Sequence, residues 1–204
     1  MLGLIFILVI ALYLVSVVLV GWVGAWLANR FGMSVRLGAV LGMLAILLPV
    51  FGDWIPMEVM FKYDCSRYAG YTQYKTLDQW KSENPGVAET LVPSNDLHST
   101  HEGDTERYTL NQRFAWDIVR PPHWFHIRER DERIVDTQNG EVLARHIDFD
   151  TDIPPIGLGI RRPGAYKIWM MKDSCEAGDI RINQVQFNGY FTDVKRLGRK
   201  SDGT

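Results

Sequence analysis

The first 52 residues of this 204-residue chain contain no lysine, aspartate or glutamate, and their only charged side chains are Arg30 and Arg36. All 24 acidic residues and 20 of the 22 basic residues lie from Asp53 onward. This segregation argues against one water-soluble domain, because such a domain spreads its charges over its whole surface. It indicates a membrane segment, residues 1–56, joined to a soluble domain, residues 57–204.

The soluble domain has no surplus of positive charge. From Asp53 onward, 20 basic and 24 acidic residues give a formal net charge of −4. No basic groove is therefore available to hold nucleic acid, and we expect no nucleic-acid partner. A domain of about 150 residues buries roughly two thirds of its unfolded surface, so a single core is expected.

Charge is also missing from the 27 residues between Leu2 and Ala28. A helix needs roughly 20 apolar residues to cross a bilayer, so this run predicts a membrane span, with Trp22 and Trp26 at the headgroup level. The alternative is a cleaved secretory signal. Such signals have a basic start and a shorter apolar stretch of about 7 to 15 residues, which this chain does not show.

A second apolar run covers residues 37–56 and predicts a second crossing, with Trp54 as an interface anchor. The turn between the two runs is short, so the pair is expected to form a helical hairpin that is embedded in the lipid bilayer. Gly38 and Gly42 form a G-x-x-x-G face that permits close helix approach. The first helix of the same hairpin or a second copy of the chain, as a homo-oligomer, would occupy that face.

The turn between the two runs carries Arg30 and Arg36, and basic residues in short loops remain cytoplasmic. The chain is therefore expected to cross the bacterial inner membrane twice, with both termini in the periplasm. Lys62, Arg67 and Lys75 follow the second run and favour the opposite orientation. The chain ends in a basic tail that consists of Lys195, Arg196, Arg199 and Lys200. In the cytoplasm this tail could bind anionic lipid, but a disordered, solubilising terminus is the preferred interpretation.

Cysteine is scarce: Cys65 and Cys175 are the only two, and both lie in the soluble domain. No C-x-x-C redox pattern exists, and an even pair in an oxidising compartment predicts one disulfide. The bridge would close a loop of about 100 residues and add on the order of 4 to 5 kcal/mol of stability. The alternative is two separate buried thiols in a cytosolic domain.

The soluble domain contains few helical signals. Thr76 can cap a short helix over residues 77–83, and Asn84-Pro85-Gly86 would end it. The polar run 89–104 predicts a surface loop. The remaining segments are rich in aromatic and β-branched residues and are expected to be strands: 57–76, 107–119, 123–136, 141–149, 165–175 and 182–197.

Asn139-Gly140 predicts a β-hairpin closed by a type I′ turn. In the second arm of the hairpin, Leu143, Ile147 and Phe149 stand at odd positions, while His146 and Asp148 stand at even positions. This alternation predicts one packed face and one solvent-exposed face. In the first arm, Phe125 and Ile127 alternate in the same way with His126 and Arg128. The fold class is therefore expected to be α+β, with an N-terminal transmembrane helical hairpin followed by a mostly antiparallel β domain with one short helix.

Catalytic motifs are largely absent. The chain has no G-x-S-x-G, and "GLGIRRPG" lacks the strand-to-helix setting of a phosphate loop. His123 and His126 would point to opposite faces of an extended segment, so they are not expected to converge. We expect no enzyme and no cofactor.

The sequence contains two sets of possible metal ligands. His98, His101, Glu102 and Asp104 are zinc-ligand types, but their spacing is not that of H-E-x-x-H, and a solvated loop is the preferred interpretation. A second set resembles the start of a calcium loop: Asp148, Asp150 and Asp152 alternate, but Ile153 and Gly159 stand where an EF-hand needs Gly and Glu.

The segments "YDCSRYAGYTQYKTLDQWKSENPG" and "RIVDTQNGEVLARHIDF" resemble a loosely defined group of small, uncharacterised bacterial inner-membrane proteins. The resemblance covers about a third of the chain and rests on a Cys, a short capped helix and an Asn-Gly hairpin. It implies a bacterial envelope protein and carries no catalytic residue.

The expected function is a membrane-anchored periplasmic domain that binds a protein partner of unknown identity, for example an immunity protein that neutralises a secreted antibacterial toxin. Four aromatic side chains could supply contact area, although most are expected in the core: Tyr68, Tyr71, Tyr74 and Trp80. The alternatives are a structural or assembly subunit of an envelope complex that uses Gly38 and Gly42, and a metal-dependent hydrolase built on His98 and His101.

Overall fold

The structure is a computed structural model that describes residues 2–94, 96–121, 124, 126–151, 167–175 and 178–198. It contains two compact units, Met1–Met57 and Glu58–Thr204. The fold is α+β, with an apolar helix at the N-terminus and a six-stranded antiparallel sheet in the second unit.

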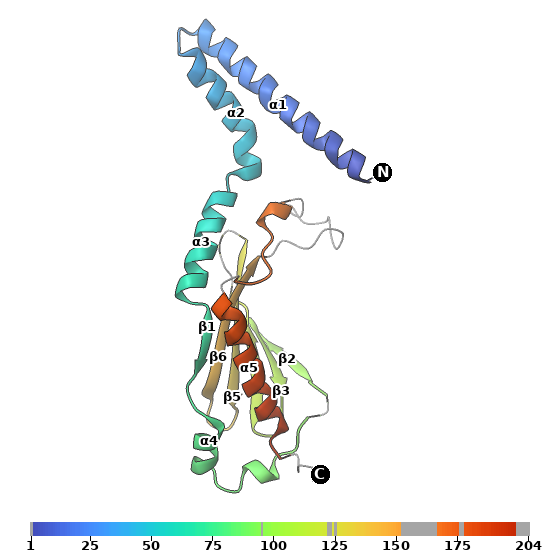
Figure 1. The fold of residues 1–204 in the computed structure, drawn as a ribbon, viewed down its shortest axis with the longest axis vertical. Coiled ribbons are helices and arrows are strands. Elements are labelled where there is room, and N and C mark those ends of the chain that lie inside the picture. Colours follow the sequence, from blue (N-terminus) through green and yellow to red (C-terminus); the bar gives the residue numbers. More distant parts are fainter. Residues whose placement is uncertain are drawn as a thin grey trace. The chain divides into compact units, whose positions relative to one another are not determined.

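The first unit consists mainly of α1 (Leu2–Arg30) and α2 (Val35–Phe51), which lie against each other (Figure 1). Glycine makes this approach possible. A Cβ atom at Gly38 would lie 2.4 Å from the Ala28 Cβ, and one at Gly24 would lie 2.3 Å from the Gly38 carbonyl oxygen. A Cβ at Gly42 would lie 2.5 Å from the Val20 carbonyl oxygen. The Gly38 and Gly42 face therefore contacts α1 of the same chain.

One helical stretch, Ile7–Arg30, is long and apolar enough to cross a membrane by itself. The 17 residues of α2 meet the same criterion only together with α3 (Trp54–Arg67), from which α2 is bent by 44°. The second crossing therefore stays a prediction.

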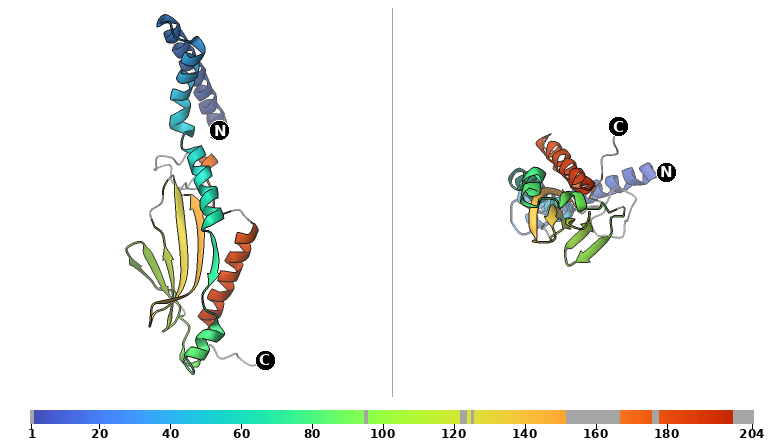
Figure 2. Two further views of the ribbon diagram at one scale, coloured as in Figure 1. Left: turned by 90° about the vertical axis from the view of Figure 1, so that its left-hand side faces the viewer. Right: turned by 90° about the horizontal axis from the view of Figure 1, so that it is seen from below.

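The second unit is built on a single sheet in the order β1-β6-β5-β4-β3-β2, in which every neighbouring pair is antiparallel (Figure 2). Its strands are β1 (Gly70–Gln73), β2 (Ser99–Glu102), β3 (Thr105–Thr109), β4 (Phe114–Val119), β5 (Ile127–Asp136) and β6 (Glu141–Thr151). The predicted antiparallel sheet is thus confirmed.

The helix α5 (Gly178–Arg196) packs on one face of this sheet (Figures 1 and 2). Its buried side chains are Phe187, Tyr190 and Val194, at the spacing of one helix face, and they join Phe114, Ile134 and Leu143 in the main core. The remaining elements are α4 (Leu77–Glu83) and two 3-10 turns, η1 (Ala88–Thr90) and η2 (Ile168–Met170).

The helix content corrects the sequence-based expectation. Residues 57–67 belong to α3, and only β1 is a strand in the segment 57–76. Residues 182–196, expected as a strand, lie in α5, and the described part of 165–175 contains η2 instead of a strand. The second unit therefore has two α-helices of its own and most of α3, not one short helix. The expected loop 89–104 contains β2.

The predicted hairpin between β5 and β6 is present, but its turn is not type I′. Residues 137–140 form the loop, and Gly140 has a φ of 74° while Asn139 does not have positive φ. A bulge follows, because Val135 pairs with Val142 and Ile134 pairs with Ala144. The extra residue, Leu143, reverses the side-chain alternation of β6.

Because of this reversal, and contrary to the prediction, Leu143 does not share a face with Ile147 and Phe149. His146, expected on the wet face, is 1% exposed and stacks on Phe187 of α5 with ring centroids 5.6 Å apart. Leu143 and Phe149 are both buried, but Leu143 belongs to the core under α5 and Phe149 does not, and Ile147 is half-buried. The bulge is the physical reason, since a one-residue shift moves every later side chain to the other face.

The predicted helix over residues 77–83 is confirmed, together with its start and end. Thr76 and Gln79 form a capping box: the Gln79 N–H donates to the Thr76 hydroxyl at 3.2 Å, and the Thr76 N–H donates to the Gln79 side chain at 2.9 Å. Asn84 is the C-terminal cap.

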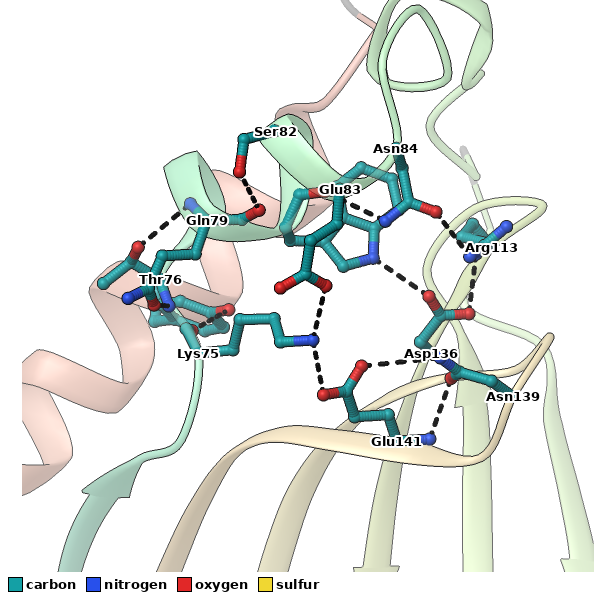
Figure 3. A network of polar contacts seen from close by, with 12 residues as sticks. Lys75, Thr76, Gln79, Ser82, Glu83, Asn84, Arg113, Asp136, Asn139 and Glu141 are labelled. Carbon is teal, nitrogen blue, oxygen red and sulfur yellow. Dashed lines mark hydrogen bonds and ion pairs between the residues drawn. The ribbon is translucent and has the colours of Figure 1, made fainter.

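Figure 3 shows how α4 is fixed to the β5–β6 hairpin. The indole of buried Trp80 donates to the Asp136 carboxylate at 2.9 Å, and Arg113 pairs with the other oxygen of Asp136 at 2.6 Å. At the surface, the Lys75 ammonium lies between Glu83 at 2.8 Å and Glu141 at 2.5 Å. Two sets of polar contacts therefore join the helix to the hairpin: a buried set around Asp136 and an exposed set around Lys75.

Candidate functional site

The two faces of the sheet differ in what covers them. Side chains of α5 contact one face: Phe191 meets Trp116 of β4, and Phe187 meets His146 of β6. We call the opposite face of the sheet, on the far side from α5, the open face (Figure 2). Side chains alternate along a strand, so the odd-numbered residues of β4 and β5 point to the open face.

The open face is built around Asp131, which is 2% exposed and accepts from two arginines. Arg145 on β6 donates through Nε and Nη2 to both carboxylate oxygens, each at 2.9 Å. Arg133, two residues along β5, donates through Nε at 2.9 Å and also through Nη2. Because Arg133 and Arg145 are directly opposed in the β5–β6 register, one carboxylate can serve both.

The same geometry sets the charge of the three groups. Burial alone would raise the pKa of Asp131, but hydrogen bonds from Arg145 and Arg133 outweigh burial, and the pKa is lowered. The hydrogen bond to Asp131 raises the pKa of Arg145. The carboxylate is therefore ionised at neutral pH, and the two guanidinium groups exceed it by one positive charge.

A second arginine–aspartate pair lies further along the open face. Arg107 of β3 donates through Nε and Nη2 to the two oxygens of Asp117 of β4, at 2.7 and 2.6 Å. The aspartate side chain is 9% exposed and the arginine side chain 44% exposed. As at Asp131, the carboxylate is buried and the guanidinium group faces solvent.

Next to Asp131, the open face contains a shallow pocket of about 420 Å³ lined by Tyr74, Arg133, Val142 and Arg145. Tyr74 is more than half exposed. The pocket combines an aromatic ring, an aliphatic side chain and two cations. Guanidinium groups are donors without acceptor capacity, so such a pocket suits an anionic group.

The face under α5 holds a different polar pair. The Nδ1 atom of His146 lies 3.2 Å from the carboxylate of Glu132, and both side chains are almost fully buried. The Nε2 atom of His146 has no hydrogen-bond partner among the described residues. A carboxylate at Nδ1 fixes the orientation of the ring. The stacking of His146 on Phe187 makes this pair part of the packing between α5 and the sheet.

Cys65 and Cys175 form a disulfide bond, with Cα atoms 5.6 Å apart and 110 residues apart in the sequence. Cys65 lies near the end of α3, and Cys175 lies three residues before α5. The bond therefore joins the C-terminal turn of α3 to the segment that precedes α5.

Arg30 is the last residue of α1, and Arg36 lies in the first turn of α2, so the two flank the turn between the helices. The guanidinium group of Arg30 lies 5.8 Å from the centre of the Trp26 ring. Both arginines are exposed. Their side of a membrane stays a prediction.

The structure does not bring the possible zinc ligands of the sequence together. His101 and Glu102 lie on β2 with exposed side chains, and His98 precedes that strand. Among the residues that the structure describes, no group of three or more His, Cys, Asp or Glu side chains could hold a metal ion. Some residues considered from the sequence lie outside the described residues: His123, Phe125, Asp152, Ile153, Gly159, Arg199 and Lys200.

The aromatic residues considered as contact area divide between core and surface. Trp80 is fully buried, and Tyr71 packs on Phe187. Tyr68 and Tyr74 are each more than half exposed. Of these four, only Tyr74 lines the pocket on the open face.

Sequence reasoning did not identify Asp131, Arg133 or Arg145. Their clustering depends on the register between β5 and β6, which the four-residue loop and the bulge at Leu143 determine. The available signal was local: Asp131 and Arg133 are two residues apart in a segment predicted as a strand and therefore share a face.

In comparisons with known proteins, no protein-family model, no curated protein and no solved structure matches the chain.

Proposed function

We propose that this protein is a bacterial inner-membrane protein that displays a disulfide-closed binding domain in the periplasm. In this proposal α1 and α2 cross the bilayer as a hairpin, the Arg30–Arg36 turn lies in the cytoplasm, and both termini are periplasmic. The apolar stretch Ile7–Arg30 and the close packing of α2 on α1 support the anchor. The two arginines in the turn support the orientation.

The observation that carries the location is the disulfide between Cys65 and Cys175. Disulfides persist in oxidising compartments such as the periplasm and are rare in the bacterial cytosol, where thiols are kept reduced. Both cysteines of the chain are used in this bond. No free thiol therefore remains that could form a disulfide with another protein.

The open face supports protein binding as the role of the displayed domain. Arginine and tyrosine are enriched among the residues that contribute most to protein–protein affinity. Here Arg133, Arg145 and Arg107 are held by buried carboxylates while their guanidinium groups face solvent, and Tyr74 lies beside them. The concrete biological form that we propose is an immunity protein that neutralises a secreted antibacterial toxin.

The location is tested with reporters fused after Thr204. Alkaline phosphatase folds only in the periplasm, and green fluorescent protein without a periplasmic adaptation is fluorescent only in the cytoplasm. We expect an active phosphatase fusion and a dark fluorescent fusion. A bright fluorescent fusion with inactive phosphatase would place the domain in the cytoplasm and end the proposal.

The immunity role is tested by competition. A sensitive strain that expresses the full chain is grown against strains that export antibacterial toxins into the periplasm of their neighbours, beside the same strain with an empty vector. Protection against one of the attackers, lost in the Cys65→Ser variant at equal protein level, is the expected result. Equal killing with and without the chain across the set of attackers contradicts the immunity form.

A further inference from the structure

We propose that the pocket of Tyr74, Arg133, Val142 and Arg145 on the open face binds a carboxylate side chain from an acidic segment of a partner protein. This inference rests on the proposed function, because it takes the occupant to be a protein. It adds a location on the domain and a chemistry for the partner, neither of which the proposed function contains.

The charge balance of the pocket is the first argument. Asp131 lies beneath it, almost completely buried, and accepts from both arginines. One carboxylate thus faces two guanidinium groups, and among the described residues no acidic side chain lines the pocket. Asp117 lies opposite Arg133 on β4 but is paired with Arg107. The surplus positive charge is directed to solvent, because the Arg133 and Arg145 side chains retain exposures of 36% and 34%. A second carboxylate, supplied from outside, completes the balance.

The second argument is the fixed orientation of the two arginines. A free arginine side chain loses rotamer entropy when it is immobilised. Here the contacts to Asp131 use Nε and Nη2 of each guanidinium group, so that loss is already incurred in the unbound protein. Binding to a preformed cation pair is less costly than binding to mobile surface arginines.

The shape and lining of the pocket point to a side chain of a protein. The pocket holds about 420 Å³, and its apolar lining is formed by Tyr74 and Val142. An aromatic ring and a valine can pack against the methylene groups of a glutamate while the arginines bind its carboxylate. A bare inorganic anion would leave this apolar wall without a contact.

The test uses the full chain in detergent micelles and a fluorescent hexapeptide of glutamate and glycine, blocked at both ends so that only side-chain carboxylates are present. Fluorescence anisotropy measures its binding, with the matching glutamine peptide as the comparison. We expect binding of the glutamate peptide only, weakened at least tenfold by Arg145→Gln and by Val142→Glu. The Val142→Glu substitution places a carboxylate in the pocket and removes none of the groups that contact Asp131.

Two matched controls separate this pocket from general electrostatic attraction. Val92→Glu introduces the same charge at an exposed valine that does not line the pocket, and Arg128→Gln removes an exposed arginine that pairs with Asp150. Both are expected to bind the glutamate peptide within twofold of the unmodified chain. Equal binding of the two peptides, or equal weakening by Val92→Glu and Val142→Glu, overturns the inference.

These outcomes are independent of the proposed location and role. The peptide measurement on purified protein is unaffected by the side of the membrane on which the domain lies. Failure of the reporter fusions with successful peptide binding would remove the periplasmic function and keep the pocket. The reverse result would keep the displayed domain and remove the carboxylate site.

Discussion

The indole N–H of Trp80 in α4 donates to the carboxylate of Asp136 at the end of β5, and both side chains are fully buried. The two residues are 56 positions apart in the sequence. This contact fixes a short helix, which would be marginal alone, to the rigid end of the sheet. Removal of the indole donor should therefore lower the stability of the whole second unit.

Trp80→Phe keeps an aromatic ring in the core and removes the hydrogen bond to Asp136. Hydrogen bonds to charged groups contribute about 1.5 to 3 kcal/mol, and we expect a loss of that size in the free energy of unfolding. Urea unfolding of the full chain in detergent, followed by circular dichroism, measures it. The matched control is Trp124→Phe, because Trp124 is 74% exposed; an equal loss in both variants would contradict the role of the hydrogen bond.

Loss of the disulfide should destabilise the second unit more than any single hydrogen bond does. A cross-link over a loop of about 100 residues contributes about 4 to 5 kcal/mol in the chain-entropy model, and the separation of Cys65 and Cys175 is 110 residues. The double variant Cys65→Ser/Cys175→Ser should unfold at clearly lower urea concentration. Reductant should shift the unmodified chain to the same midpoint and leave the double variant unchanged. A midpoint that does not respond to reductant would show that the bond is not formed.

Stability should fall in acid because of Asp131. Its pKa is lowered in the folded chain, so the contribution of its ion pairs is fully present above the unfolded value of about 3.9 and is lost as pH falls through the lower folded pKa. We expect the free energy of unfolding to decrease below about pH 4. In Asp131→Asn the decrease should be smaller, and the stability at pH 7 should already be reduced by about 2 kcal/mol. Parallel pH profiles for the two proteins would contradict this assignment.

The contact between α1 and α2 should not tolerate a larger side chain at Gly38. A Cβ there would already lie 2.4 Å from the Ala28 Cβ, so Gly38→Leu must push the helices apart. Overpacking of this kind costs about 1 to 3 kcal/mol or more. Thermal melting of the helical signal in lipid nanodiscs should occur at lower temperature. Leu41→Ile, at a position of the same helix that is 53% exposed, is the control and should leave the melting temperature unchanged.

The parts of the fold that were predictable have strong local signals. The long uncharged run at the N-terminus predicted α1, and Thr76 with Asn84-Pro85-Gly86 predicted the start and end of α4. The Asn139-Gly140 pair marked the β5–β6 hairpin, although it did not fix the turn type. In these segments the local preference and the final structure agree.

The errors occurred where aromatic and β-branched residues stand in helices. In α5, Val185 and Phe187 alternate like a strand, but Phe187, Tyr190 and Val194 are the residues that are buried together. A spacing of three and four residues was therefore the more informative pattern. In α3 the buried Phe61 and the disulfide-bonded Cys65 are four residues apart, which is also a helical spacing.

The pocket on the open face was beyond sequence reasoning for a different reason. Arg145 and Asp131 meet only because β6 pairs with β5 in one register, and the bulge at Leu143 decides which side chains of β6 face Asp131. A shift of one residue would have placed Arg145 under α5 and His146 on the open face. The charged residues were visible in the sequence, but their shared carboxylate was not.

The most direct test of the central claim is the redox state of Cys65 and Cys175 in living cells. Cells that express the full chain are quenched in acid, and free thiols are then labelled with a maleimide-linked polymer that retards the protein on a gel. We expect no retardation without reductant and a shift by two labels after reduction. Two labels without reductant would show free thiols in the cell and would contradict a domain that is displayed in the periplasm.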